Sequence, residues 1–151
     1  MPINIRKAKI SDLLKTYEWA NEKEVIKSSI ERSSKVSLTE HKKWFKKYLI
    51  SKSKNLFIAC VNNKKIGLVR LDLEKKEYFI SYLVDKKNRN KGLGFAMLSK
   101  ILKKYKNKKI IFKARVKKEN FASNIIFTRL GFRKRYINHN KDISLFRLDN
   151  S

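Results

Sequence analysis

The sequence is poor in cysteine, in acidic residues and in long apolar runs. Cys60 is the only cysteine among 151 residues, so no internal disulfide can form. Because Cys60 lies within the apolar segment 56–61, we expect a small core residue rather than a nucleophile. No run of about 18 apolar residues occurs, and residues 1–6 lack the apolar region of a signal peptide. These absences together predict a cytoplasmic protein that does not span a membrane.

The shortage of acid leaves the chain strongly basic. Asp and Glu number 13 against 39 Lys and Arg, which gives a formal net charge of +26. Such a charge favours anionic partners, among them nucleic acid and phosphorylated small molecules. The excess is 30 Lys against 9 Arg, scattered along the chain as in an AT-rich genome with a lysine codon bias. The charge therefore favours an anionic substrate or cofactor, and nucleic acid ranks below a small molecule as the partner.

The length and the apolar content of 42% fit one domain over residues 1–151. Hydrophobic periodicity predicts alternating strands and helices along it. The strands are expected at 3–8, 55–61, 66–73, 78–84, 110–116, 132–138 and 142–148, with the last hairpin turning at His139 and Asn140. The helices are expected at 11–20, 37–48, 95–105 and 119–130, with a short helical piece within 21–35. This order predicts an α/β fold with a mixed sheet and helices on both of its faces.

Two of these helices carry aromatic residues of interest. Ser11 and Asp12 are expected to cap the first helix. Its apolar stripe is expected to be Leu13, Leu14, Tyr17 and Ala20. Trp19 falls on the opposite side, so it either packs under a loop or faces a cleft. A capping-box pattern at 37–40 opens the second helix, where His41 shares an apolar stripe with Trp44, Phe45 and Tyr48.

Two of the four glycines, Gly92 and Gly94, stand in one bend between a strand and a helix. The first amides of a helix have no intrahelical partner, and the helix dipole adds positive charge there. Glycine lets the backbone approach an anion, and Arg89 and Lys91 add full charges. The pattern predicts a phosphate site; a turn that uses glycine for geometry alone is the alternative. The bend lacks the third glycine of a dinucleotide fingerprint and the Gly-Lys-Ser/Thr of a Walker loop.

Two motifs resemble a known family. Arg89-x-x-Gly92-x-Gly94 after a strand resembles the acetyl-CoA pyrophosphate motif of the GCN5-related N-acetyltransferases (GNAT), and the segment 120–132 is similar to their second motif, a helix ending in Gly-Phe. The likeness implies a GNAT fold, a mostly antiparallel sheet whose two central parallel strands splay into a V that holds acetyl-CoA as cosubstrate. The cofactor contacts that it implies are Leu83, Val84, Arg89, Asn90, Lys91, Gly92, Leu93, Gly94, Phe95, Asn120, Ser123, Asn124 and Phe127.

The N-terminal half resembles a narrower group, the nucleotide-sugar amine acetyltransferases, which include the pseudaminic acid pathway enzyme. The likeness rests on Trp19-x-Asn21, Ser28-Ser29 and His41-x-x-Trp44-Phe45. It implies a small-molecule amine as partner, most specifically the amino group of a nucleotide-linked amino sugar. The substrate contacts that it implies are Trp19, Asn21, Lys27, Ser28, His41 and Trp44. Lys27 stands where the group often has arginine, and it supplies charge without the bidentate fork.

The acceptor and the assembly stay open at this level. A protein N-terminus, a polyamine or an aminoglycoside is an alternative acceptor within the same fold, and a basic nucleic-acid-binding protein ranks lower. A homodimer is one of the open oligomeric states. No cluster of His, Cys or carboxylates has metal-ligand spacing, so no metal is expected. Lys113 and Arg115 share one strand face, where they either meet acidic groups or are solvated.

Acetyl transfer to an amine requires a neutral amine, a polarised carbonyl and aligned reactants. Alignment alone supplies up to ~7–11 kcal/mol in ideal cases, and a thiol of pKa near ~8.5 leaves readily, so no strong base is needed. The family usually places a tyrosine where this chain has Phe127, which cannot donate a proton and is otherwise a core residue. The hydroxyl candidates are Tyr82, Ser81 and Tyr136. His41 either accepts the amine proton through water, binds the acceptor, or simply packs.

Overall fold

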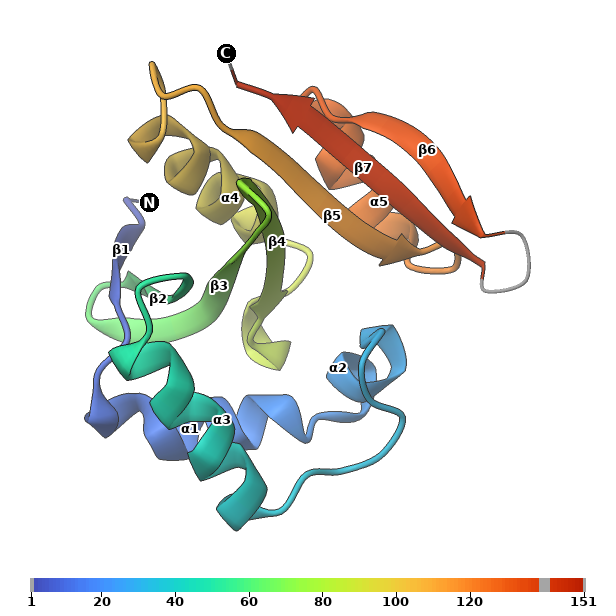
Figure 1. Cartoon of the computed structure of the whole chain (residues 1–151). Coiled ribbons are helices and arrows are strands. Elements are labelled where there is room, and N and C mark those ends of the chain that lie inside the picture. The colour runs from blue at the N-terminus through green and yellow to red at the C-terminus, as the bar shows by residue number, and fades with distance from the viewer. Residues whose placement is uncertain (1, 139–141, 151) are drawn as a thin grey trace.

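The computed structural model describes residues 2–138 and 142–150. Seven strands form one mixed sheet in the order β1-β2-β3-β4-β5-β7-β6, with helices on both faces (Figure 1). The strands are β1 (Asn4–Lys7), β2 (Lys54–Val61), β3 (Lys64–Glu74), β4 (Glu77–Val84), β5 (Ile111–Lys117), β6 (Arg133–Asn138) and β7 (Ile143–Asp149). The helices are η1 (Ile10–Asp12), α1 (Leu13–Ala20), α2 (Lys23–Ser28), α3 (Leu38–Ile50), η2 (Lys86–Asn88), α4 (Leu93–Lys104) and α5 (Phe121–Arg129). The turn expected at His139 and Asn140 and the side chain of Tyr136 lie outside the described part.

The two central strands, β4 and β5, form the parallel pair of the sheet and separate after a short contact. Their pairing runs over three residues of each strand, Glu77–Phe79 against Ile111–Lys113. All other neighbouring strands are antiparallel. Beyond Phe79 the two strands diverge, which confirms the expected V-shaped splay and the mixed, mostly antiparallel sheet.

The register shows which backbone groups face the gap between β4 and β5. The amide of Asp85 donates to the carbonyl of Ile66 at 2.7 Å, directly beyond the paired residues Val84 and Gly67. Because hydrogen-bonded and non-hydrogen-bonded pairs alternate in an antiparallel ladder, Leu83 bonds to β3. The backbone groups of Tyr82 and Val84 therefore point to the open edge. Of the two residues whose backbones were predicted to meet the cofactor, Val84 faces the open edge and Leu83 is bonded to β3.

Two hydrophobic layers hold the helices against the sheet. Helices α4 and α5 cover one face, where Met97, Leu98 and Ile101 pack with residues of β3, β4 and β5 in the larger cluster. Helices α1 and α3 cover the other face of the N-terminal half, where Trp19 and Phe45 are the central residues. Cys60 is buried in this second cluster, which confirms its place in the core. Among the described residues, no helix is long and apolar enough to cross a membrane.

Helix α1 faces the sheet mainly with residues other than those predicted, although Leu13 of the predicted stripe packs against the second cluster. Leu14 is 67% exposed, whereas Thr16 and Trp19 are fully buried. The prediction weighed aliphatic residues and gave the wrong face. Trp19 has a larger apolar surface to bury than Leu14, and its indole N–H finds a carboxylate inside, so the helix turns this side inward.

Asp12 was expected to cap α1 and does not. Its carboxylate is fully buried and accepts hydrogen bonds from Arg6 at 2.8 and 2.9 Å and from the amide of Lys9 at 2.8 Å. Lys65 from β3 adds an ion pair at 2.7 Å. Burial opposes the charge, but these partners outweigh it and hold the pKa of Asp12 well below its ordinary value. Asp12 therefore ties β1 to β3 and closes the capping box of η1, the turn before α1, while its side chain does not cap α1 itself.

Candidate active site

The bend before α4 presents free backbone amides. Gly92 is the N-cap of this helix with φ +74°, and no atom lies within 4 Å of the Cβ that another residue would carry there. Within the described part of the chain, the amides of residues 92–95 donate to no acceptor. A positive φ at an open helix N-terminus thus leaves a concave set of N–H groups, as an anion site requires.

Arg89 does not face this set of amides as a free charge. Its Nε donates to the carbonyl of Val84 at 2.9 Å, and its guanidinium contacts the Glu22 carboxylate at 2.5 Å. Asn90 has φ 62° and is exposed, like Lys91. The motif arginine therefore fixes the bend to β4 and to the segment after α1.

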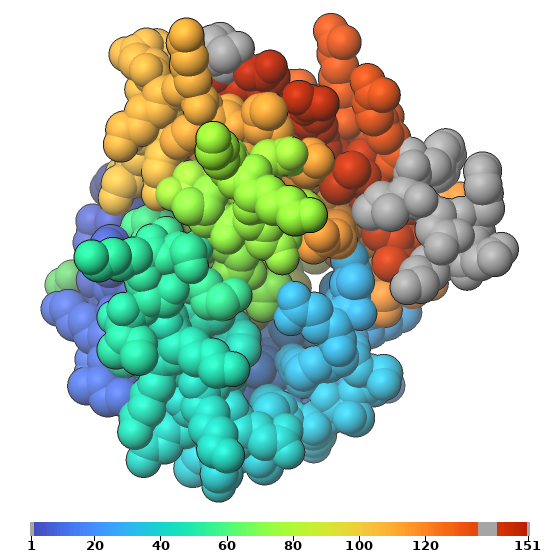
Figure 2. Space-filling view, viewed as in Figure 1, coloured from blue at the N-terminus to red at the C-terminus, as the bar shows by residue number. Residues whose placement is uncertain are grey.

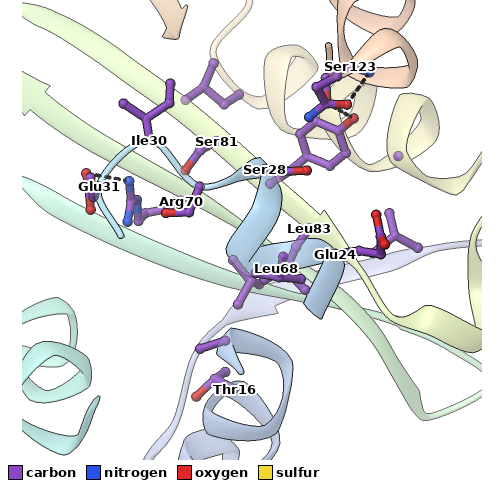
Figure 3. Close-up of a pocket in the computed structure, with 18 of the residues that line it drawn as sticks. Thr16, Glu24, Ser28, Ile30, Glu31, Leu68, Arg70, Ser81, Leu83 and Ser123 are labelled. Atoms are coloured by element: carbon purple, nitrogen blue, oxygen red, sulfur yellow. Dashed lines mark hydrogen bonds and ion pairs between the residues drawn. The ribbon is translucent and has the colours of Figure 1, made fainter. Parts of the chain in front are cut away.

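One cavity of about 960 Å³ begins at this bend and continues to the other face of the sheet. Its cofactor-side half lies between β4, the start of α4 and α5. Its second half, which we call the acceptor half, lies between α2, the loop 29–36, α3 and β3 (Figure 3). In the space-filling view, a hollow opens between the light-blue residues of α2 and the strands β4 and β5 (Figure 2).

The cavity gathers most of the predicted site residues. Those that line it are Ser28, His41, Trp44, Ser81, Tyr82, Leu83, Val84, Arg89, Asn90, Gly92, Leu93, Gly94, Asn120 and Ser123. Those that lie outside its lining are Trp19, Asn21, Lys27, Lys91, Phe95, Asn124 and Phe127. The substrate contacts expected at Trp19, Asn21 and Lys27 are therefore not supported, since these side chains pack, hold a loop or point to solvent.

Two hydroxyls meet across the cofactor side of the cavity. The Tyr82 hydroxyl on β4 lies 2.7 Å from that of Ser123 on α5. Burial raises the pKa of Tyr82, and the Ser123 hydrogen bond only partly offsets this, so the phenol stays neutral. Asn120 accepts from the Ser123 amide at 3.2 Å and so caps α5. Ser81, the residue before Tyr82 in β4, faces the opposite side of the sheet, toward the acceptor half (Figure 3).

Phe127 and Asn124 serve the packing of α5. Phe127 is 2% exposed, and its ring packs on Phe132 and Phe146 with centroids 5.1 and 5.7 Å away. This supports the core interpretation of Phe127. The Asn124 amide nitrogen donates to the carbonyls of Lys117 and Asn120, while its buried oxygen has no hydrogen-bond partner among the described residues.

His41 is a buried, neutral side chain at the wall of the acceptor half. Burial, with a smaller contribution from Arg32, lowers its pKa to about 4. Its Nε2 lies 2.9 Å from the Thr16 hydroxyl, which itself donates to the carbonyl of Leu13. That hydroxyl has one hydrogen, so when it donates to Leu13, the His41 Nε2 is the donor in the contact with Thr16. The half-buried Trp44 ring stacks on the imidazole at 5.3 Å.

Residues 19–22, which we call the junction, bond to both halves of the site. The Trp19 indole N–H donates to Asp85 at 2.7 Å, and Glu22 binds Arg89, so both reach the bend before α4. Asn21 exchanges two hydrogen bonds with the backbone of Val36, at 2.8 and 3.0 Å. The carbonyl of Ala20 accepts from Arg32 at 2.7 Å.

Asp85, which binds Trp19 of the junction, is a residue that the sequence analysis did not single out. Burial disfavours its charge, but hydrogen bonds from Trp19 and the Lys87 amide, together with Lys15, lower the pKa of Asp85 overall. It also caps η2, the turn that leads into the glycine bend. Its position directly after an apolar strand was the available signal.

Charges in the acceptor half are mostly paired. Arg70 contacts Glu31 at 3.1 Å and Asp72 at 3.4 Å, and the Tyr48 hydroxyl donates to Asp72 at 2.6 Å. Arg70 and Asp72 were missed, although two charges at i and i+2 in a buried strand mark one polar face. The exposed carboxylates of Glu24 and Glu40 line the cavity as well.

Comparison with known proteins identifies the fold and the family model that the chain matches. Residues 3–133 match the model of an acetyltransferase (GNAT) domain, and no curated protein matches. A domain from Methanocaldococcus jannaschii DSM 2661 has a TM-score of 0.85 at 22% identity, over 98% of both chains. Spermidine N-acetyltransferase from Vibrio cholerae, solved with CoA and spermine, has a TM-score of 0.85 at 16% identity, over 98% of this chain and 95% of that one. A ribosomal L7/L12 alpha-N-protein acetyltransferase solved with coenzyme A has a TM-score of 0.82 at 16% identity, over 97% and 93%.

Proposed function

Because the chain belongs to the family of GNAT acetyltransferase domains, which transfer an acetyl group from acetyl-CoA to an amine, we propose that its acceptor is the primary amine of a nucleotide-linked amino sugar. The observation that carries the proposal is the shared cavity, which joins the free amides of residues 92–95 to a half walled by the His41–Trp44 ring pair. We place this reaction in the cytoplasm, in keeping with the single cysteine.

The cofactor side fits acetyl-CoA, which supplies a thioester-activated acetyl group when bound. The amides of residues 92–95 would hold its diphosphate. The backbone groups of Tyr82 and the amide of Val84 face the open edge of β4 and would pair with its pantetheine arm as a neighbouring strand does, while the Val84 carbonyl already accepts from Arg89. Ser123 and Asn120 border the same space from α5.

The chain's main contribution to the reaction is alignment. A sugar amine loses its proton easily near neutral pH, so holding it against the thioester supplies most of the catalysis. Tyr82, paired with Ser123, would hydrogen-bond the departing sulfur, because its raised pKa keeps the phenol protonated. Ser81 lies on the acceptor side of β4 and would orient the amine.

His41 is proposed as a wall of the acceptor half rather than as a base. A group with a pKa of about 4 takes up very little proton from an amine at neutral pH. The imidazole and the Trp44 ring instead offer a flat apolar surface to a sugar ring, and Ser28 on α2 adds a hydroxyl nearby. Arg115 on β5 brings a guanidinium to the same cavity, suited to a phosphate group.

A turnover screen tests the acceptor. Purified protein with acetyl-CoA is offered UDP- and dTDP-linked amino sugars, spermine, an aminoglycoside and a peptide with a free N-terminus, and thiol release and acetylated product are measured. We expect turnover with at least one nucleotide amino sugar and at least ten times lower kcat/KM with the others. Product from peptides or polyamines alone would show that the acceptor is wrong while the acetyltransferase activity stands.

A cationic small molecule is the second candidate acceptor. Glu24 and Glu40 line the acceptor half with no ion-pair partner among the described residues, and they would attract a polyamine. The similar Vibrio cholerae structure contains spermine. On this hypothesis, Glu24→Gln with Glu40→Gln raises the KM for spermine; on ours, it leaves the KM for a nucleotide amino sugar unchanged or lower.

A further inference from the structure

One face of the C-terminal half of the sheet carries an arginine surface, defined by Lys113, Arg115, Lys117, Arg133, Arg135 and Arg147. The register sets these residues side by side: Arg147 of β7 stands opposite both Lys113 and Arg133. In the next row, Leu145 stands opposite both Arg115 and Arg135. Strands lie roughly 5 Å apart, and alternate residues are about 7 Å apart, so these cations form a compact grid.

Apart from α2, whose Lys27 carbonyl accepts from Lys117 at 2.8 Å at one end, no helix of the described chain lies over this face. Helix α5 lies behind β5, β7 and β6 in the view of Figure 1, and the near face of these strands is open. The side chains that alternate with the arginine surface, Ala114, Ser144 and Phe146 among them, are buried on the α5 side. Arg115, Arg133, Arg135 and Arg147 are all exposed.

The charges of the arginine surface are only partly neutralised. Lys113 pairs with Glu77 at 2.6 Å and Arg115 approaches Glu74 at 3.8 Å, both at the end near β4, where Asp149 also lies. Arg133, Arg135 and Arg147 have no partner among the described residues. Like charges directly opposite in a sheet destabilise it, so the pairing of Arg147 with Lys113 and Arg133 lowers the stability of the fold.

Composition bias does not explain the arginines. A lysine codon bias accounts for lysines scattered over the chain, but four of the nine arginines lie on this one small surface. Guanidinium differs from ammonium in offering a planar fork that matches phosphate and carboxylate oxygens. The concentration of arginine therefore indicates recognition of an anion.

The arginine surface is continuous with the acceptor half. Arg115 belongs to both, and its guanidinium lies over the Phe79 ring of β4 at 3.8 Å. Described outward residues of β5, β7 and β6 include no aromatic ring on which nucleic-acid bases could stack. A small phosphorylated group reaching out of the cavity fits this surface better than a single-stranded nucleic acid.

We propose that the arginine surface binds the phosphate groups of the acceptor, so that the amine enters the cavity while the diphosphate stays on the strands outside it. This inference rests on the proposed function and adds where the nucleotide end lies. It makes Arg135 and Arg147 specificity-determining residues that are remote from the reacting atoms.

Binding of UDP to CoA-saturated protein tests this proposal, because bound CoA blocks the other diphosphate site. We expect calorimetry to show that Arg135→Gln with Arg147→Gln weakens UDP binding at least about tenfold. The matched control, Lys103→Gln with Lys106→Gln, removes the same charge from the other face and should leave UDP binding unchanged. Arg135→Lys with Arg147→Lys should fall between, because charge is kept and the fork is lost.

Several outcomes would overturn the proposal. Equal losses in the arginine and lysine variants would show general charge attraction, and no loss in either would show that UDP binds elsewhere. Binding of an RNA oligomer with a steep salt dependence, but not of UDP, would make this face a nucleic-acid interface. If UDP fails to bind while a phosphate-free amine is still acetylated, the arginine surface does not bind the acceptor's phosphates, and the acetyltransferase activity is unaffected. If UDP binds here but no nucleotide amino sugar is acetylated, the proposed acceptor falls instead.

Discussion

The buried environment of His41 makes the stability of the fold depend on pH. The unfolded chain has a histidine with a pKa near ~6.5, whereas the native pKa is about 4. Between these values the unfolded state binds more protons, so stability falls as pH falls from 6.5 toward 4. The difference amounts to roughly 3 kcal/mol. Asp12 and Asp85, whose pKa values are lowered, lose their contributions only below this window.

His41→Gln should remove most of this pH dependence, because glutamine can still donate to Thr16 without titrating. Urea unfolding at pH 7 and pH 4.5 would measure the free energy of unfolding of both proteins. We expect the wild type to lose about 2–3 kcal/mol more than the variant. Parallel losses would place the titrating group elsewhere.

Gly92 and Gly94 stand two residues apart and should respond differently to alanine. At Gly92 the positive φ costs about 1 kcal/mol, and the new methyl group would occupy space that is open in the structure. We therefore expect Gly92→Ala to weaken CoA binding at least about tenfold with a small loss of stability. Calorimetry with CoA and thermal unfolding together measure both effects.

Gly94→Ala is the contrasting variant. Its Cβ would lie 3.0 Å from Tyr82 and 3.2 Å from Ile126 inside the packed start of α4. We expect a loss of about 1–3 kcal/mol of stability. If Gly92→Ala destabilised the fold by as much and left CoA affinity intact, its glycine would serve geometry alone.

Among the elements, the junction links the two halves of the site. Glu22→Gln keeps the size of the side chain and weakens its bond to Arg89, which then is free to move from Val84. We expect both CoA affinity and acceptor KM to worsen about three- to tenfold, because Asn21 in the same junction holds the acceptor loop. Glu18→Gln, one helical turn earlier and exposed, is the control. A change in CoA affinity alone would show that the junction does not reach the acceptor half.

Elements with clear hydrophobic periods were predicted well from sequence, and long-range polar pairs were not. The stripe of α3 and the hairpin of β2 and β3 follow from local spacing. Trp19 and Asp85 are 66 residues apart, and Glu22 and Arg89 are 67 apart, so no local pattern shows that they meet. For the same reason Arg89 was predicted as a free phosphate ligand, and α1 was given the wrong inward face.

At the scale of the whole molecule, the net charge of +26 opposes compactness. Exposed like charges repel, and the repulsion is screened as the Debye length falls from about 10 Å at 0.1 M to 3 Å at 1 M salt. We expect Tm to rise by several degrees between about 0.05 and 0.5 M NaCl. The variant Lys103→Gln with Lys106→Gln should show a smaller rise. A fall in Tm would mean that surface ion pairs outweigh the repulsion.

Only three residue pairs between β4 and β5 connect the N-terminal and C-terminal halves of the sheet. A pantetheine arm bound along the unpaired part of β4 would restrict the motion of this strand. Hydrogen exchange would measure this effect. We expect CoA to slow exchange at the amides of Tyr82 and Val84, whereas the Leu83 amide, already bonded to β3, should change little. Equal protection of all three would contradict the register. On this proposal, the pantetheine arm takes the place of a strand along the part of β4 that β5 leaves unpaired.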